Sequence, residues 1–233
     1  MHINLKEFAI CESIYGNMIF PKNDVVVGKS LPLYGEWAEG ENIVMSQFLT
    51  IGDNVIDIGA NIGTTSISLS RSVGETGKVF SFEPQQLMAQ CLSANVLINN
   101  RRNIEVFTLA VSSKSGWVYL DSDELGAKGR YGSVGVGDNG HQVKAINLNE
   151  FEIKDCAFIK IDVEGHEWEV IQGADSFLKL HKPVVYFEAK KELAGTREVI
   201  KWFMNNGWDC YWHFAFWFRE NNWKKQQKNI FGG

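Results

Sequence analysis

Hydrophobic positions between residues 53 and 188 follow a regular alternation, in which short β-branched runs are separated by longer segments with apolar residues at helical spacing. This alternation is typical of βαβ units, in which helices connect parallel strands. It predicts an α/β fold with a doubly wound, mostly parallel, Rossmann-like sheet. The predicted strands are 54–58, 78–82, 104–110, 157–162 and 184–188, and the predicted helices are 62–72, 85–99 and 165–180.

The alternation breaks between the third and fourth of these strands. Two further strands, predicted at 117–120 and 143–148, flank a stretch with six glycines between residues 126 and 140. A loop of this length is uncommon inside a compact domain. We interpret it as either a mobile lid or a segment without regular structure.

The chain before the sheet has a pattern of its own. Residues 25–27 favour a short strand or coil, and residues 40–49 favour a helix. We expect residues 1–50 to form a short cover over one edge of the sheet and residues 51–233 to form the main domain. The length of 233 residues fits one large domain with such an appendage.

Composition narrows the classes of function. The chain is 45% hydrophobic, contains 4 prolines and has a formal net charge of −5, which is typical of a soluble globular protein and argues against nucleic acid as a partner. No uncharged apolar stretch is long enough to predict a membrane span. The 4 cysteines lie far apart and form no Cys-x-x-Cys pair, so we expect a reducing, cytoplasmic location. The oligomeric state cannot be predicted from these features.

The strongest chemical signal lies where the first predicted strand meets the first predicted helix. The segment Asp57-Ile-Gly-Ala-Asn-Ile-Gly63 places glycines where the backbone must turn sharply beside a nucleotide. Glu83 ends the next strand, where its carboxylate can accept both hydroxyls of a ribose. Asn61 replaces a glycine of the dinucleotide motif, and Asp57 would repel a pyrophosphate but favours the ammonium and sulfonium of S-adenosylmethionine. An NAD-binding oxidoreductase is the alternative that shares the loop and Glu83.

Taken in order, the motifs of this chain resemble those of FkbM-type class I methyltransferases. They are Asp57 to Gly63, Phe82-Glu83-Pro84, Leu109-Ala-Val-Ser112 with Gly116 after it, and Ile159-Lys-Ile-Asp-Val-Glu-Gly-His-Glu167, and the resemblance covers roughly residues 33–188. It implies S-adenosylmethionine as the methyl donor. It also implies O-methylation of a hydroxyl on a saccharide-containing or secondary-metabolite acceptor, which is a small molecule or a glycan.

The same resemblance implies a set of donor-binding residues. They are Glu36, Asp57, Gly59, Ala60, Asn61, Gly63, Glu83, Pro84, Ala110 and Asp162. In this set the residues of the glycine loop would hold the methionine part, Glu83 the ribose, and Ala110 would lie near the adenine. Glu36, in the segment Tyr34-Gly-Glu-Trp37, would close over the donor.

Three titratable groups, Asp162, Glu164 and His166, follow the fourth predicted strand. Methylation of an alcohol requires a group that takes up the hydroxyl proton. We expect His166 or Glu164 to be this base and Asp162 to contact the ammonium of the donor. The alternative is that Glu164 and His166 only cap the helix that starts near Gly165.

Glu188 ends the fifth predicted strand and would point into the same crevice, where we expect it to contact the acceptor. A salt bridge to Lys190 or Lys191 is the alternative. Together with Asp162 and Glu164 it could hold a magnesium or calcium ion. We do not favour this divalent metal and predict no metal ligands.

The end of the chain is rich in aromatic rings. Five of the 8 tryptophans (Trp202, Trp208, Trp212, Trp217, Trp223) fall in the last 32 residues, and residues 208–218 are predicted to form a strand. We expect most rings to pack in the core and His213 to be a second candidate for contact with the acceptor. The family resemblance implies a closing antiparallel strand pair, which we expect to be incomplete here. A non-catalytic carbohydrate-binding or scaffold protein on the same fold is the alternative function that these rings favour.

Overall fold

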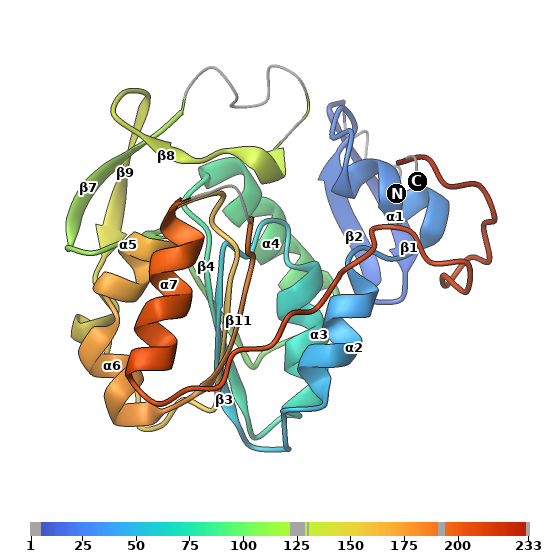
Figure 1. Cartoon of the computed structure of the whole chain (residues 1–233). Helices are drawn as coiled ribbons and strands as arrows, with labels where there is room; N and C mark the ends of the chain where they lie inside the picture. The colour runs from blue at the N-terminus through green and yellow to red at the C-terminus, as the bar shows by residue number, and fades with distance from the viewer. Residues whose placement is uncertain (1–5, 122–128, 130, 191–193, 232–233) are drawn as a thin grey trace.

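The computed structural model describes residues 6–121, 129, 131–190 and 194–231 (Figure 1). Its centre is a sheet of five parallel strands in the order β11–β10–β3–β4–β5. The strands are β3 (Asn54–Ile58), β4 (Lys78–Phe82), β5 (Ile104–Phe107), β10 (Phe158–Ile161) and β11 (Val184–Phe187). The predicted doubly wound sheet is confirmed, and β3 and β4 have the predicted bounds.

Helices cover both faces of this sheet (Figure 1). They are α2 (Glu39–Ser46), α3 (Thr64–Ser72) and α4 (Gln86–Ile98) on one face, and α5 (Glu167–Gln172), α6 (Asp175–His181) and α7 (Ala194–Asn205) on the other. Successive strand residues point to opposite faces. Val55 and Val79 pack in the cluster with α3 and α4, whereas Ile56 and Phe80 pack in the cluster with α5, α6 and α7. None of the helices in the described ranges is long and apolar enough to cross a bilayer.

The helix predicted over residues 165–180 is interrupted at Gly173, which separates α5 from α6. A Cβ atom at Gly173 would overlap the carbonyl oxygen of Ser112. The amide of Asn149 also donates to the carbonyl oxygen of Gly173 at 3.0 Å. The interruption therefore lies at a tertiary contact with the preceding loops. The periodicity of apolar residues does not reveal such a contact.

A second, smaller sheet lies beside the first, with strand order β6–β9–β7–β8. Its strands are β6 (Ala110–Val111), β7 (Gly116–Leu120), β8 (Val136–Gly137) and β9 (His141–Ile146), and 3₁₀ turns cover Tyr131–Ser133 and Leu148–Glu150. The extra strands predicted here correspond to β7 and β9. The strand predicted over 104–110 is split, because the chain leaves the main sheet after Phe107 and pairs with β9 from Ala110. In the glycine-rich stretch, residues 126–128 and 130 lie outside the described residues.

The N-terminal segment contains a hairpin of β1 (Phe8–Ser13) and β2 (Gly16–Pro21), followed by α1 (Val27–Tyr34) and α2. The hairpin lies on α4, where the Asn95 side chain donates to the Ile19 carbonyl at 3.0 Å and accepts from the Ile19 amide at 2.6 Å. The hairpin therefore packs against the helix layer of one face, and the expected division into a cover and a main domain stays a prediction. The hairpin was not predicted, because its two strands pair only with each other and do not belong to the alternation of strands and helices that reveals the main sheet.

The strand predicted over residues 208–218 is not formed. The segment leaves α7, crosses in front of the sheet and reaches α1 as an extended coil (Figure 1). In the part of the chain that the structure describes, no backbone hydrogen bond joins it to β11. Side chains hold its two ends instead. The Trp208 indole donates to the Pro183 carbonyl at 3.2 Å, and the ring centroids of Trp217 and Trp37 are 5.8 Å apart.

Candidate active site

A cavity of about 1340 Å³ opens at the carboxyl ends of β3, β4, β10 and β11. Helix α2, the described part of the glycine-rich stretch and the C-terminal segment complete its wall. The residues predicted for the site that line it are Gly59, Ala60, Asn61, Glu83, Pro84, Ala110, Asp162, Glu164, His166, Glu188 and His213. The other predicted site residues do not line it: Asp57 is buried against Lys160, Gly63 lies against Leu92, and Glu36 contacts the C-terminal segment.

The loop after β3 turns through backbone conformations that favour glycine. Gly59 and Gly63 have φ of +79° and +93°, and Asn61, at +50°, shares the left-handed region. A Cβ atom at Gly59 would overlap the carbonyl oxygen of Asp162, and one at Gly63 would overlap the Leu92 side chain. The glycines thus bring the loop close to β10 and α4, and the loop edge faces the cavity.

Glu83 is buried at the end of β4, and its carboxylate is held by the loop it faces. One oxygen accepts from the Asn61 amide at 2.8 Å, and the other accepts from the Gln85 amide at 2.8 Å. Burial raises the pKa of Glu83 to about 7, although the two backbone hydrogen bonds oppose the rise. The carboxylate is therefore fixed in one orientation at the cavity wall.

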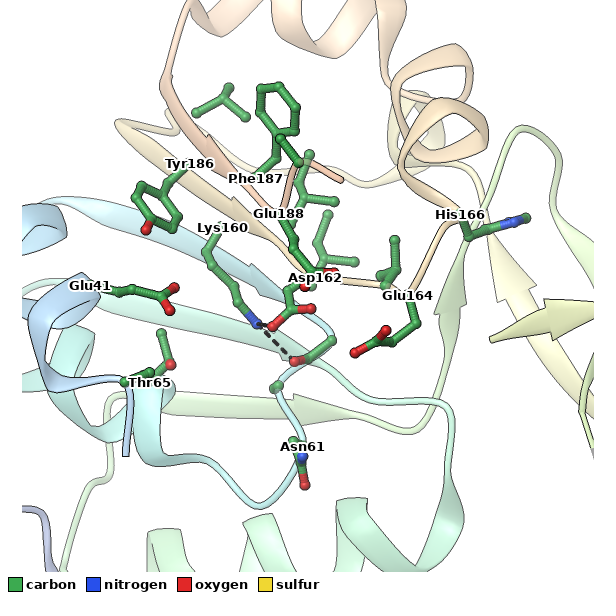
Figure 2. A pocket seen from close by; sticks show the side chains of 18 of the residues that line it. Glu41, Asn61, Thr65, Lys160, Asp162, Glu164, His166, Tyr186, Phe187 and Glu188 are labelled. Atoms are coloured by element: carbon green, nitrogen blue, oxygen red, sulfur yellow. Dashed lines mark hydrogen bonds and ion pairs between the residues drawn. The ribbon is translucent and has the colours of Figure 1, made fainter. Parts of the chain in front are cut away.

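Lys160 is the buried cation of the site, within β10. Its ammonium donates to the Gly59 carbonyl at 2.9 Å and lies 3.4 Å from a carboxylate oxygen of both Asp57 and Asp162. Figure 2 shows this contact with Asp162 at the centre of the pocket. Burial opposes the charged form, but the carboxylates outweigh it and raise the pKa of Lys160 above its ordinary value. Lys160 thereby ties the glycine loop to the end of β10.

Three carboxylates, those of Asp162, Glu164 and Glu188, converge at the ends of β10 and β11 (Figure 2). One oxygen of each lies within 4.8 Å of the others. The ammonium of Lys190 lies 2.6 Å from Glu164 and 3.1 Å from Glu188, so a cation of the chain itself already bridges two of them. Burial and the two neighbouring carboxylates raise the pKa of Glu188 to about 7. Glu188 can therefore exchange a proton near neutral pH.

Glu41 on α2 and Tyr186 on β11 lie close to each other in the wall of the cavity (Figure 2). Burial raises the pKa of the Tyr186 hydroxyl, and so do the negative charge of Glu41 and the hydrogen bond that the hydroxyl donates to the Glu41 carboxylate. The same hydroxyl is hydrogen-bonded to Nδ1 of His213 at 2.9 Å. The predicted acceptor residue His213 is thus joined to β11 by a side chain and not by strand pairing.

The imidazole of His166 points away from the three carboxylates (Figure 2). Its Nε2 lies 2.9 Å from the Ser112 hydroxyl, and its Nδ1 lies 3.6 Å from Glu169 in the first turn of α5. Burial lowers the pKa of His166. The structure therefore brings Asp162, Glu164 and Glu188 together and separates His166 from them.

Glu36 is engaged with the C-terminal segment. It accepts a hydrogen bond from the Trp223 amide at 2.7 Å and lies 3.7 Å from the Arg219 guanidinium. A Cβ atom at the adjacent Gly35 would overlap the Trp223 ring. A donor-contacting role for Glu36 stays a prediction, and its observed partner is the strap formed by residues 219–231.

The described part of the glycine-rich stretch packs against the glycine loop that follows β3. The carbonyl of Tyr131 accepts from the Gln85 side chain at 2.7 Å, and the Tyr131 hydroxyl donates to Asn23 at 3.0 Å. Gly132 lies so close to Asn61 that an added Cβ atom would come within 3.2 Å of its amide nitrogen. These contacts connect the cavity wall to the N-terminal segment.

Sequence reasoning missed four functional candidates: Lys160, Lys190, Glu41 and Tyr186. For Lys160 a signal existed, since a lysine stands inside the otherwise apolar strand Phe158-Ile-Lys-Ile161 and must be paired if the strand is buried. Lys190 was considered only as an alternative partner of Glu188. Glu41 and Tyr186 are far apart in sequence and carried no signal that places them in one site.

Residues 57–210 match the family model of the Methyltransferase FkbM domain. The hexuronic acid methyltransferase AglP of Haloferax volcanii is 31% identical over 134 residues, which are 54% of this chain and 52% of the relative. This chain therefore spans about half the length of that relative.

Two solved structures are also similar to this chain. The methyltransferase FkbM from Methylobacillus flagellatus is 18% identical, with 66% of this chain and 36% of the other covered and a TM-score of 0.48. A putative rRNA-methylase from Clostridium thermocellum is 13% identical, with 72% and 79% covered and a TM-score of 0.46.

Proposed function

The chain belongs to the FkbM family of methyltransferases, and from this premise we propose that it transfers a methyl group from S-adenosylmethionine to a hydroxyl of a saccharide-containing or secondary-metabolite acceptor. The observation that carries the proposal is the carboxylate of Glu83, fixed by two backbone amides at the wall of a large cavity beside the glycine loop. The name of the Haloferax relative, a hexuronic acid methyltransferase, supports a saccharide as acceptor.

The residues around the loop fit S-adenosylmethionine better than a dinucleotide. Asp57 and Asp162 place negative charge beside the loop, and the ammonium of Lys160 is taken up by these carboxylates and by the Gly59 carbonyl. Among the described residues beside the loop, a pyrophosphate would find no unpaired cation. Two buried amide oxygens at the cavity, Asn61 Oδ1 and Gln85 Oε1, have no hydrogen-bond partner among the described residues and could accept from an amine of the donor.

We infer which residues would hold the donor from these positions. Glu83 would accept the ribose hydroxyls, the loop from Gly59 to Asn61 would border the methionine part, and Ala110 would border the adenine. When bound, S-adenosylmethionine supplies an electrophilic methyl group on a sulfonium. Asp162 supplies a carboxylate for its ammonium, and Lys160 keeps that carboxylate in place.

Glu188 is the base that we propose for the acceptor hydroxyl. With a pKa of about 7 it is ionised in a large fraction of molecules near neutral pH and still holds a proton well enough to accept one from an alcohol. Glu164 shares the ammonium of Lys190 with Glu188, so the two carboxylates and Lys190 would act together. His166, which contacts Ser112, would support the end of β10 from behind.

Binding of S-adenosylhomocysteine, measured by titration calorimetry, tests the donor assignment. We expect saturable heat at micromolar concentrations, and the Glu83→Ala variant should bind at least about tenfold more weakly because the ribose loses its acceptor. Glu105→Ala is the matched control, because this exposed acid pairs with Lys78 outside the cavity. Absence of heat at high micromolar concentration, or equal affinity in Glu83→Ala, would overturn the assignment.

Transfer of a radiolabelled methyl group to sugars, glycolipids and cell extracts tests the reaction itself. We expect a labelled product in which the methyl group is attached to oxygen. Label on nitrogen or carbon would contradict O-methylation. Tight glycan binding without any transfer would favour the non-catalytic alternative.

A further inference from the structure

The C-terminal segment presents rings to the cavity. Tyr211, Trp212, Phe214 and Trp217 line it, yet their side chains are 89%, 53%, 69% and 56% exposed. Rings that only packed in the core would be buried, as those of the clusters beside the sheet are. Exposed apolar surface that borders a cavity with a few convergent polar groups is typical of a ligand site. The rings offer flat surfaces for the apolar C–H face of a sugar.

The charge of the cavity is negative. Its described lining carries six carboxylates (Glu41, Glu83, Asp162, Glu164, Glu188, Asp209) and three lysines (Lys160, Lys182, Lys190). S-adenosylmethionine would add one net positive charge, and Glu83 and Glu188, whose pKa values are raised to about 7, are only partly ionised near neutral pH. The ionised carboxylates of the described lining still outnumber its cations. Like charges repel strongly in a partly buried site, because the effective dielectric constant there is well below that of water.

The lysines of the lining are not placed to receive an anionic acceptor at the reacting end. Lys160 is held between Asp57 and Asp162, and Lys190 between Glu164 and Glu188. Lys182 precedes β11 and lies at the amino end of that strand, away from the carboxylates. Of the described lining residues, the acids at the carboxyl ends of β10 and β11 therefore set the charge that an acceptor meets there.

We propose that the acceptor end of this cavity binds a neutral or amino sugar, stacked on the rings of Tyr211, Trp212, Phe214 and Trp217, and discriminates against a sugar acid at the reacting position. The inference rests on the proposed function and narrows its acceptor class. A hydroxyl or an ammonium of the sugar can donate to Glu41, Asp162 or Glu188. A carboxylate at the same place would be repelled by these groups, and the lysines of the described lining are either paired already or lie at the amino end of β11.

An oligosaccharide array tests this preference by binding. Fluorescently labelled protein, with and without saturating S-adenosylhomocysteine, is applied to glycans that are identical except for a terminal glucose, glucosamine or glucuronic acid. We expect binding to the glucose and glucosamine forms to be at least about tenfold tighter than binding to the glucuronic acid form. Equal or tighter binding of the glucuronic acid form, or no binding to any of the three, would overturn the inference.

Variants separate the rings from the charge. The double variant Tyr211→Ala/Trp212→Ala should weaken binding to the glucose form by about tenfold, because two stacking surfaces are lost. Phe216→Ala is the matched control, since this ring is 73% exposed in the same segment but does not line the cavity. Glu188→Gln should reduce the discrimination against the glucuronic acid form. Discrimination that is unchanged in Glu188→Gln, or equal losses in the ring variant and its control, would contradict the proposed site.

The two proposals fail in different measurements. Heat with S-adenosylhomocysteine but no sugar preference on the array would overturn this inference and leave the proposed function standing. Absence of that heat would overturn the donor assignment, whereas the array read without the donor analogue would still report the acceptor preference.

Discussion

At the scale of single residues, the ammonium of Lys160 balances the buried carboxylate of Asp57 and the partly exposed carboxylate of Asp162. Asp57 is fully buried, and Lys160 is 6% exposed. Breaking such a pair by removing one partner leaves a buried charge without compensation, which costs far more than the pair itself contributes. The lysine of β10 therefore supplies the opposite charge that Asp57 and Asp162 need beside the glycine loop.

Replacement of Lys160 tests this balance. Lys160→Met should lower the free energy of unfolding by about 3–5 kcal/mol, measured by chemical denaturation. The control is Lys78→Met, which breaks the exposed pair with Glu105 at 2.7 Å and should change stability by less than about 1 kcal/mol. Adding Asp57→Asn to Lys160→Met should restore part of the loss. Similar effects of the two lysine variants would contradict a paired buried cation.

The titration of Glu188 gives a pH dependence with a defined sign. A base must be deprotonated to act, and the pKa of Glu188 is raised to about 7. The rate of methyl transfer should therefore rise with pH and reach half its maximum near pH 7. Glu188→Gln should lower kcat by about a hundredfold or more and remove this limb from the profile.

Glu164 provides the comparison for that profile. Its carboxylate is one cause of the raised pKa of Glu188. In Glu164→Gln the rise of the methyl-transfer rate should consequently persist but occur at a lower pH. A limb near pH 7 that persists in Glu188→Gln would assign the base to another group.

At the scale of elements, close approaches between segments decide where helices end. Gly173 lies between α5 and α6, and the Ser112 carbonyl occupies the space that a side chain would need there. Gly195 in α7 has no such neighbour, since an added Cβ atom would be 3.7 Å from the Trp168 side chain. A side chain is therefore excluded at Gly173 but fits at Gly195.

Alanine substitutions at these two positions should have opposite effects. Gly173→Ala should destabilise the protein by about 1–3 kcal/mol, because the backbone of α5 or of the Ser112 loop must shift. Gly195→Ala should be neutral or stabilise by up to about 1 kcal/mol, since alanine favours the helix. Thermal unfolding followed by circular dichroism measures both, and a harmless Gly173→Ala would contradict the tight packing at this break.

At the scale of the whole molecule, the cavity joins parts that are distant in the chain. The glycine loop and Glu83 are linked through Gln85 to Tyr131, and Tyr131 is linked to Asn23 in the N-terminal segment. The C-terminal strap is fastened to Glu36. A ligand in the cavity would therefore stabilise contacts across the whole fold.

Binding of S-adenosylhomocysteine should raise the stability of the protein by mass action. At a ligand concentration of about 100 times Kd, the free energy of unfolding should increase by about 2.7 kcal/mol, which corresponds to a Tm increase of roughly 5–10 °C. At the same ligand concentration the shift should be about half as large or smaller in Glu83→Ala, because its Kd is at least about tenfold higher, and unchanged in Glu105→Ala. Scanning calorimetry provides the measurement, and an equal shift in Glu83→Ala would contradict the role of Glu83.

The sequence by itself determined the main sheet, the glycine loop and the acid at the end of β4. These features follow from local rules, since the period of apolar residues specifies strands and helices and the turn after β3 requires glycine. The carboxylates Asp162, Glu164 and Glu188 were predicted for the same reason, because parallel strands present their carboxyl ends at one edge of the sheet.

Only the tertiary structure decided how these side chains are paired and oriented. The pairing of Lys160 with Asp57, the capture of Glu36 by the strap and the turn of His166 toward Ser112 all depend on residues 54 to 187 positions apart in the chain. The path of residues 208–218 was likewise decided by ring contacts at its two ends. The periodicity of apolar residues does not reveal such contacts. It indicates which face of a helix or strand is buried, but not which residues pack against that face.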